Sequence, residues 1–129
     1  MFVDASAICA ILLNESDADQ FVAKLAAEPT RLTSAIAVFE VVRAIERVTG
    51  QDVTTVRTMV ARFLDTAQVR CVDIGAAERE AALDAMDRFG KGRHPAQLNM
   101  GDCFAYACAR THGASLLFKG DDFSKTDIA

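Results

Sequence analysis

The chain has 129 residues, of which 51% are hydrophobic and 25% are charged. This length suits one folded domain, here spanning residues 1–129, and the composition argues against an intrinsically disordered chain. The formal net charge of -4 argues against a protein that holds nucleic acid by an overall positive charge, so any contact with nucleic acid must be local.

Short apolar segments alternate with amphipathic ones along the chain. Strands are expected at residues 1–4, 31–33, 69–74 and 115–118, and helices at residues 6–13, 17–27, 34–49, 52–67, 76–89 and 99–111. Ser34 and Asn99 are good N-caps, Gly50 and Gly113 end their helices, and residues 90–99 form a glycine-containing basic loop. Strands separated by helices favour an α/β fold in three layers, with a central parallel sheet flanked by helices.

The amino-terminal segment MFVDASAICAILLNES contains an apolar run without a basic leader or a cleavage-site context. We expect it to be neither a signal peptide nor a membrane span. The four cysteines, Cys9, Cys71, Cys103 and Cys108, include no CxxC pair. We therefore expect small core residues in a reducing cytoplasm, and neither a zinc site nor a disulfide framework.

Acidic residues lie beside several of the predicted elements. Asp4 ends the first strand, the Asp121-Asp122 pair follows the last strand, and Asp102 lies in the first turn of a helix. Glu40 lies in mid-helix within AIAVFEVV, among mostly small or apolar neighbours, so we expect it to point into a cleft. Ligands of parallel sheets bind outside the carboxyl ends of the strands. If the fold gathers these acids, they form an oxygen-rich pocket suited to Mg²⁺ or Mn²⁺, which predicts a metal-dependent phosphodiesterase.

These acids also have structural interpretations, which the residues alone leave open. Asp4 could simply cap the helix that follows it, and Asp102 could complete a capping arrangement with Asn99. The Asp121-Asp122 pair could be an acidic turn, and Glu40 could form an exposed ion pair with an arginine on its own helix.

The chain contains the segments FVDASAICAILLNE, SAIAVFEVVRAIE, KGRHPAQLNMGDCFAYACA and LLFKGDDFSKTDI, which lie between residues 2 and 128. Together they resemble the PIN-domain ribonucleases, specifically the VapC-type toxins of type II toxin-antitoxin modules. The resemblance implies a PIN-like fold, dependence on Mg²⁺ or Mn²⁺, and hydrolysis of RNA phosphodiester bonds that inhibits translation and growth. It also implies a cognate VapB-type antitoxin in the active-site groove, a homodimer and a toxin-antitoxin hetero-oligomer.

Position by position, the resemblance assigns metal binding to Asp4 and Asp102. It assigns catalytic roles to four acids: Asp4, Glu40, Asp102 and Asp121. The adjacent acids in KGDDF leave the register open, so Asp122 is the alternate for Asp121. Ser6 matches a hydroxyl position after the first aspartate, where it could hold a metal-bound water.

Phosphates need cations beside an acidic pocket. The candidates lie in the basic loop, on one helix and after the last strand: Lys91, Arg93, His94, Arg43 and Lys119. Such a local basic rim predicts salt-sensitive RNA binding, although the loop could equally serve solubility.

Two other classes of protein fit parts of the sequence. A receiver-like signalling domain needs paired acids after its first strand, but Asp4 is followed by Ala5 and Ser6. A catalytically silent PIN-like module, binding RNA or a partner, would keep the fold without the activity. An RNA cleavage assay separates this module from a nuclease.

Overall fold

A computed structural model describes residues 1–128, and its four strands form one parallel sheet. The strands are β1 (Phe2–Val3), β2 (Arg31–Ser34), β3 (Val69–Val72) and β4 (Leu116–Leu117), and they lie in the order β3-β2-β1-β4. β2 pairs with one side of β1 and β3 with the far side of β2, whereas β4 pairs with the other side of β1. The strand order therefore reverses at β1.

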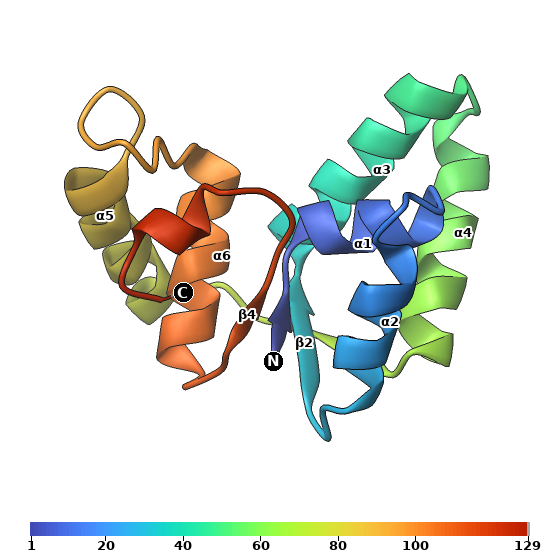
Figure 1. The fold of residues 1–129 in the computed structure, drawn as a ribbon, viewed down its shortest axis with the longest axis horizontal. Helices are drawn as coiled ribbons and strands as arrows, with labels where there is room; N and C mark the ends of the chain where they lie inside the picture. The colour runs from blue at the N-terminus through green and yellow to red at the C-terminus, as the bar shows by residue number, and fades with distance from the viewer. Residues whose placement is uncertain (129) are drawn as a thin grey trace.

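Helices cover both faces of the sheet, which confirms the three-layer α/β architecture. In chain order they are α1 (Ala5–Leu12), α2 (Ala18–Ala26), α3 (Ala35–Thr49), α4 (Val53–Thr66), α5 (Ala76–Phe89) and α6 (Met100–Thr111), followed by the 3-10 turn η1 (Phe123–Lys125). Figure 1 shows α1 to α4 on one side of the strands, and α5, α6 and the carboxyl terminus on the other.

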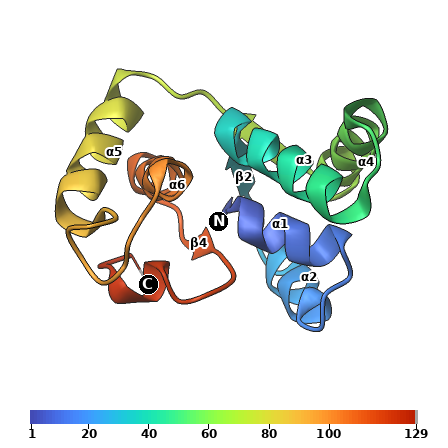
Figure 2. The same cartoon turned by 90° about the horizontal axis from the view of Figure 1, so that it is seen from above.

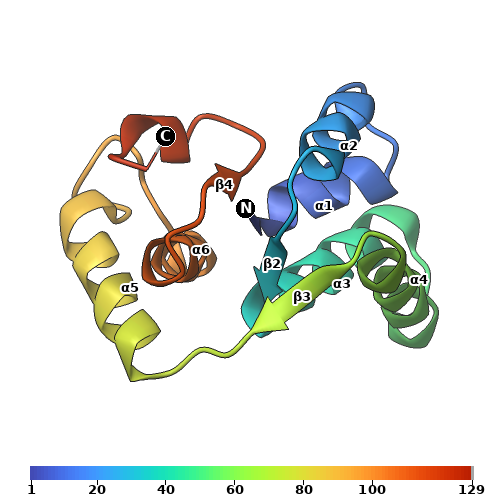
Figure 3. The ribbon, with the colours of Figure 1, turned by 90° about the horizontal axis from the view of Figure 1, so that it is seen from below.

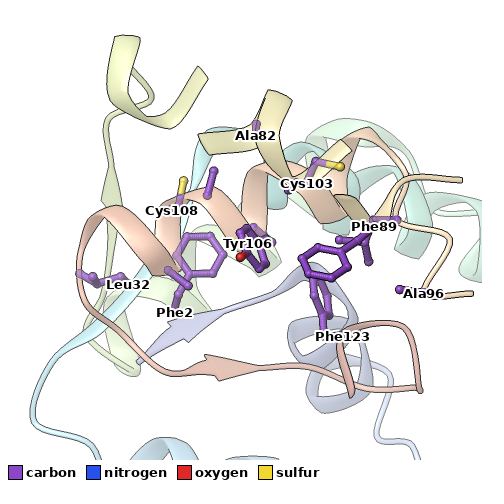
Figure 4. Packing of buried hydrophobic residues seen from close by; sticks show 14 of the residues in the cluster. Phe2, Leu32, Ala82, Phe89, Ala96, Cys103, Tyr106, Cys108 and Phe123 are labelled. Carbon is purple, nitrogen blue, oxygen red and sulfur yellow. The ribbon is translucent and has the colours of Figure 1, made fainter. Parts of the chain in front are cut away.

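Successive strand residues face opposite sides of the sheet, and this alternation divides the core into two clusters. Phe2, Leu32 and Val72 face α5 and α6, where they join a cluster that contains Phe89 and Tyr106. Figure 4 shows Phe2 and Leu32 beside α6.

The neighbouring strand residues face the other way. Val3, Val69 and Leu117 join Ile8 and Val41 in the second cluster, which packs against α1 to α4. Because Phe2 and Val3 are both fully buried on opposite faces, the short strand β1 lies in the middle of the molecule. The residues that follow β1 therefore emerge from the centre of the sheet.

The predicted helix caps at Ser34 and Asn99 are confirmed. The Ser34 hydroxyl accepts a hydrogen bond from the backbone N–H of Ala37 (3.2 Å), and the Asn99 side chain accepts one from the backbone N–H of Asp102 (2.9 Å). Gly50 ends α3 with φ 70°, a left-handed conformation that favours glycine. Local sequence signals thus fix where α3 and α6 begin, and these two helices carry Glu40 and Asp102.

All four cysteines are free thiols in the structure. Cys103 and Cys108 are buried and Cys9 is half-buried, whereas Cys71 is exposed, so the prediction of a core position is wrong for Cys71. Cys71 lies on β3, the edge strand seen in Figure 3, where one side of the strand has no neighbour. Among residues 1–128, no helix combines the length and the apolar character needed to cross a membrane.

Candidate acidic site

The acidic side chains lie at the carboxyl end of the sheet, where the strand order reverses. Asp4 directly follows β1, and its backbone N–H donates a hydrogen bond to the carbonyl of Leu117 on β4 (2.9 Å). Figure 2 looks down on this edge, with α1, α3 and α6 around the strands. A reversal of strand order opens a crevice between the two loops that leave in opposite directions. At this point the structure brings together the loops after β1 and β4.

Asp4 is the most buried of these acids, with 5% of its surface exposed. Its Oδ2 atom accepts hydrogen bonds from the backbone N–H (3.0 Å) and the hydroxyl (2.5 Å) of Ser6. Burial raises the pKa of Asp4 above its usual value, the hydrogen bonds from Ser6 partly oppose that rise, and the negative charge of Asp122 adds to it. Asp4 is therefore an N-cap of α1 and also a buried carboxyl group beside other acids.

Ser6 connects α1 to the loop after β4. Its hydroxyl donates to Asp4 and also accepts a hydrogen bond from the backbone N–H of Lys119 (2.9 Å). The hydroxyl thus fixes the orientation of the Asp4 carboxylate relative to the loop that carries Asp122. The proposed role of Ser6 in holding a metal-bound water stays a prediction.

Asp102 belongs to a complete capping box at the start of α6. Its Oδ2 atom accepts a hydrogen bond from the backbone N–H of Asn99 (3.0 Å), whereas its Oδ1 atom has no hydrogen-bond partner within residues 1–128. Burial, and then the negative charges of Asp4 and Asp122, raise the pKa of Asp102 to about 6, against the lowering effect of the Asn99 hydrogen bond. The hydrogen bond to Oδ2 therefore orients the Asp102 carboxylate, and Oδ1 is left available for a ligand.

Glu40 reaches this group from α3. Burial, and then the negative charges of Asp4 and Asp102, raise the pKa of Glu40 to about 7. Within the described chain Glu40 has no ion pair, so the alternative of a salt-bridged surface glutamate finds no support. Its carboxylate instead packs against the first turn of α6 at Gly101.

Asp121 and Asp122, which follow β4, differ in their electrostatic effect on Asp4 and Asp102. The negative charge of Asp122 raises the pKa of both Asp4 and Asp102, and Asp121 is not among the charges that do so. The Asp121 backbone carbonyl accepts a hydrogen bond from the Ser124 hydroxyl (2.6 Å), which fixes the turn into η1. The charge that acts on Asp4 and Asp102 is thus that of Asp122, and whether Asp121 or its alternate Asp122 completes the site stays a prediction.

Polar contacts of Asp127 attach the carboxyl-terminal segment, which also carries Asp122, to α5 and α6. Asp127 Oδ1 accepts a hydrogen bond from the Tyr106 hydroxyl (2.7 Å), and Asp127 Oδ2 pairs with Arg88 and Arg110 (2.9 Å each). These interactions lower the pKa of Asp127 to about 2, and the hydrogen bond from Tyr106 has the largest effect. Sequence reasoning missed Asp127, because its partners lie on α5 and α6 and no local pattern marks them.

The carboxylate oxygens of the acidic site are donors that suit a hard divalent cation. Carboxylate oxygens are the preferred ligands of Mg²⁺ and Mn²⁺, and burial together with the neighbouring acids raises the pKa values of Glu40 and Asp102. Within residues 1–128, no three His, Cys, Asp or Glu side chains meet closely enough to form a ready ion-binding group. Asp4, Glu40 and Asp102 are nonetheless near enough for the charge of Asp4 to raise the pKa values of the other two.

The lysines and arginines among the predicted RNA-contacting residues fall into two groups. Lys119 pairs with Asp17 (3.1 Å) and Glu15 (3.3 Å), and Arg93 pairs with Asp87 (3.2 Å). Arg43 and Lys91 form no ion pair with the described part of the chain. Exposed ion pairs are weak and can exchange for a phosphate, so all four cations stay predicted contacts.

Comparisons with known proteins found a matching family model, related sequences and a solved structure of similar fold. A family model described as a PIN domain matches residues 1–129. The chain is 41% identical over 129 residues to Ribonuclease VapC30 of Mycobacterium tuberculosis, a match that covers 100% of this chain and 96% of that protein. It is 40% identical over 129 residues to Ribonuclease VapC of Mycolicibacterium smegmatis, covering 100% and 98%.

A solved structure shows a similar fold. The crystal structure of Mycobacterium tuberculosis VapC20, described as a Sarcin-Ricin loop cleaving toxin, matches with a TM-score of 0.77 and 20% sequence identity. The match covers 99% of this chain and 95% of that chain. At this level of identity, the likeness concerns the arrangement of helices and strands.

Proposed function

The chain belongs to the PIN-domain family, and on this premise we propose that it is a VapC-type endoribonuclease that acts as the toxin of a toxin-antitoxin module. As one PIN domain, it would hydrolyse RNA phosphodiester bonds and thereby inhibit translation and growth. One observation carries the proposal: at the carboxyl edge of the sheet, burial raises the pKa values of Asp4, Glu40 and Asp102, and the negative charge of Asp4 raises those of Glu40 and Asp102 further. Acids gathered at such a point form a site for a cation and an anionic substrate.

Asp4 and Asp102 are the residues proposed to hold Mg²⁺ or Mn²⁺. The bound cation would neutralise charge on the scissile phosphate and make a water molecule more acidic. The hydrogen bonds of Ser6 and Asn99 orient the two aspartates before any ligand arrives. Glu40, on which the charges of Asp4 and Asp102 act, is the residue proposed to accept a proton from the attacking water at one of its carboxylate oxygens.

The chain carries net negative charge, so the RNA must be held by local cations. Arg43 and Lys91 are the first candidates because neither is engaged by an acid in the described residues, and Arg93 and Lys119 can join by exchanging their surface partners. We also propose a cytoplasmic protein that forms a homodimer and binds a VapB-type antitoxin. The VapC names of the relatives support the antitoxin part of this proposal.

The central test is RNA cleavage by the wild-type protein and by Asp4→Asn, each with and without Mn²⁺. We expect the wild type to cleave RNA only with the metal, and the variant to be inactive under both conditions. Asparagine keeps an acceptor oxygen for the Ser6 hydrogen bonds, so α1 retains its cap. Equal activity of the two proteins would contradict the catalytic assignment. RNA binding without cleavage by the wild type would favour the silent binding module.

A second test compares the adjacent acids after β4. We expect Asp122→Asn to lower kcat/KM by about tenfold or more, because Asp122 contributes negative charge at Asp4 and Asp102. Asp121→Asn should stay within about threefold of the wild type. The pair is well matched, since both residues are exposed and the substitutions are identical. The reverse order of effects would return the assignment to Asp121.

A further inference from the structure

Gly101 lies in the first turn of α6, directly against the Glu40 carboxylate. A Cβ atom added at Gly101 would lie 2.5 Å from both Cδ and Oε1 of Glu40, and it would overlap Oε2 more closely still. Real Cβ atoms essentially never approach other heavy atoms closer than 3.0 Å. No side chain can therefore occupy position 101 while Glu40 keeps its place.

The backbone gives no reason for a glycine at this position. Gly50 and Gly113 have positive φ angles of 70° and 59°, but Gly101 is not among the positive-φ glycines and lies within a helix. Glycine destabilises a helix relative to alanine because it loses more conformational freedom on folding. Gly101 therefore weakens α6, and its benefit must come from the space that it leaves.

That space is filled by the end of a flexible side chain. Glu40 extends from α3 and can adopt other rotamers towards solvent, so an added methyl group would displace its carboxylate without disturbing either helix. The displaced carboxylate would move away from Asp4 and Asp102, whose charges act on it in the present arrangement. The Gly101 backbone thus sets how deeply Glu40 enters the acidic site.

We propose that Gly101 is a positioning residue, which serves the reaction by admitting the Glu40 carboxylate to a place beside Asp4 and Asp102. The role in the reaction rests on the proposed ribonuclease function. The steric role does not, because it concerns only the contact between α3 and α6.

The test is Gly101→Ala, with Gly75→Ala as the matched control. Gly75 is the N-cap of α5, has φ -117°, and an added Cβ there meets no atom within 4 Å. We expect Gly101→Ala to keep or raise the melting temperature of the metal-free protein, to reduce the Mn²⁺-induced rise in that temperature, and to lower kcat/KM by about 10²-fold. Gly75→Ala should leave the Mn²⁺ response and kcat/KM unchanged.

A double-mutant cycle separates displacement of Glu40 from general damage to α6. In a Glu40→Asp background the carboxylate is one methylene shorter, so Gly101→Ala should lower kcat/KM by clearly less than in the wild type. In a Glu40→Ala background it should leave the Mn²⁺ response unchanged. The proposal would be overturned if Gly101→Ala lowered kcat/KM equally in the wild-type and Glu40→Asp backgrounds, or reduced the Mn²⁺ response equally in the wild-type and Glu40→Ala backgrounds. Wild-type activity of the single variant would also overturn it.

A crystal structure of Gly101→Ala gives a readout that is independent of RNA and metal. We expect the Glu40 carboxylate to have turned away from Asp4, with α3 and α6 unmoved. A carboxylate still in its original place would overturn the proposal even if activity were lost. Absence of RNA cleavage by the wild type would instead contradict the proposed function, and the crystal structure would still decide the steric role.

Discussion

Asp102→Asn is expected to abolish RNA cleavage and the stabilisation by Mn²⁺ while the protein stays folded. The substitution removes one negative charge at nearly constant volume. It also keeps an oxygen that can accept the hydrogen bond from the Asn99 backbone N–H, so the capping box at the start of α6 survives. The helix and the site thus depend on different properties of the same side chain.

The expected loss of activity is large. A carboxylate that holds a divalent cation contributes through the several kcal/mol by which that cation stabilises charge on the phosphate. Removing it should lower kcat by on the order of 10³-fold, since each 1.36 kcal/mol of transition-state stabilisation is worth tenfold in rate. The metal-free variant should be at least as stable as the wild type near neutral pH, because the change relieves repulsion at Asp4 and Glu40.

The matched control is Asp84→Asn, an identical change at an exposed acid on α5. It should leave both cleavage and the Mn²⁺-induced shift in melting temperature unchanged. Thermal unfolding with and without Mn²⁺, together with cleavage rates, measures both effects. A full Mn²⁺ shift retained by Asp102→Asn would remove Asp102 from the set of metal ligands.

The fold could be predicted from the sequence because its signals are local. Ser34, Asn99 and Gly50 mark helix ends through contacts within a few residues, and those contacts are present in the structure. The strands could be recognised because short apolar segments separate the helices. The third strand ends at Val72, two residues earlier than expected, and the first and last strands are also shorter than expected.

The site was only partly predictable, because its remaining features depend on residues that are distant in sequence. Asp4 and Asp102 each fitted two interpretations, a helix cap and a site acid, and the structure shows that the two are compatible, since a cap needs only one oxygen. Three features arise between separate elements: the effect of the Asp122 charge on Asp4, the contact of Gly101 with Glu40, and the hydrogen bond from Tyr106 to Asp127. No spacing within one segment encodes such contacts.

In the absence of metal, the protein is expected to be more stable at about pH 5 than at about pH 7.5. The pKa of Glu40 is raised from 4.5 to about 7, and that of Asp102 from 3.8 to about 6. Between the unfolded and folded pKa values, the folded protein binds more protons than the unfolded chain. Stability therefore falls as pH rises through this window, which is opposite to the usual behaviour of a salt-bridged carboxylate.

The expected difference is roughly 2 kcal/mol in the free energy of unfolding, because the two groups share one repulsion and are partly screened by solvent. Asp127 acts in the other direction, but its pKa of about 2 places its effect at lower pH, outside this window. Urea unfolding with a chelator present, at both pH values, measures the difference. The Glu40→Gln/Asp102→Asn double variant should show a much smaller difference, since neither substituted group titrates.

Mn²⁺ should reverse this dependence, because the cation binds the same carboxylates only when they are deprotonated. Saturating metal should then stabilise the protein more at about pH 7.5 than at about pH 5, since protons compete with the cation at the lower pH. A metal-free protein whose stability rises from about pH 5 to about pH 7.5 would contradict the crowding of Glu40 and Asp102. A metal response that does not depend on pH would show that the cation binds elsewhere. The two pH profiles thus test the electrostatics of the acidic site separately from RNA cleavage.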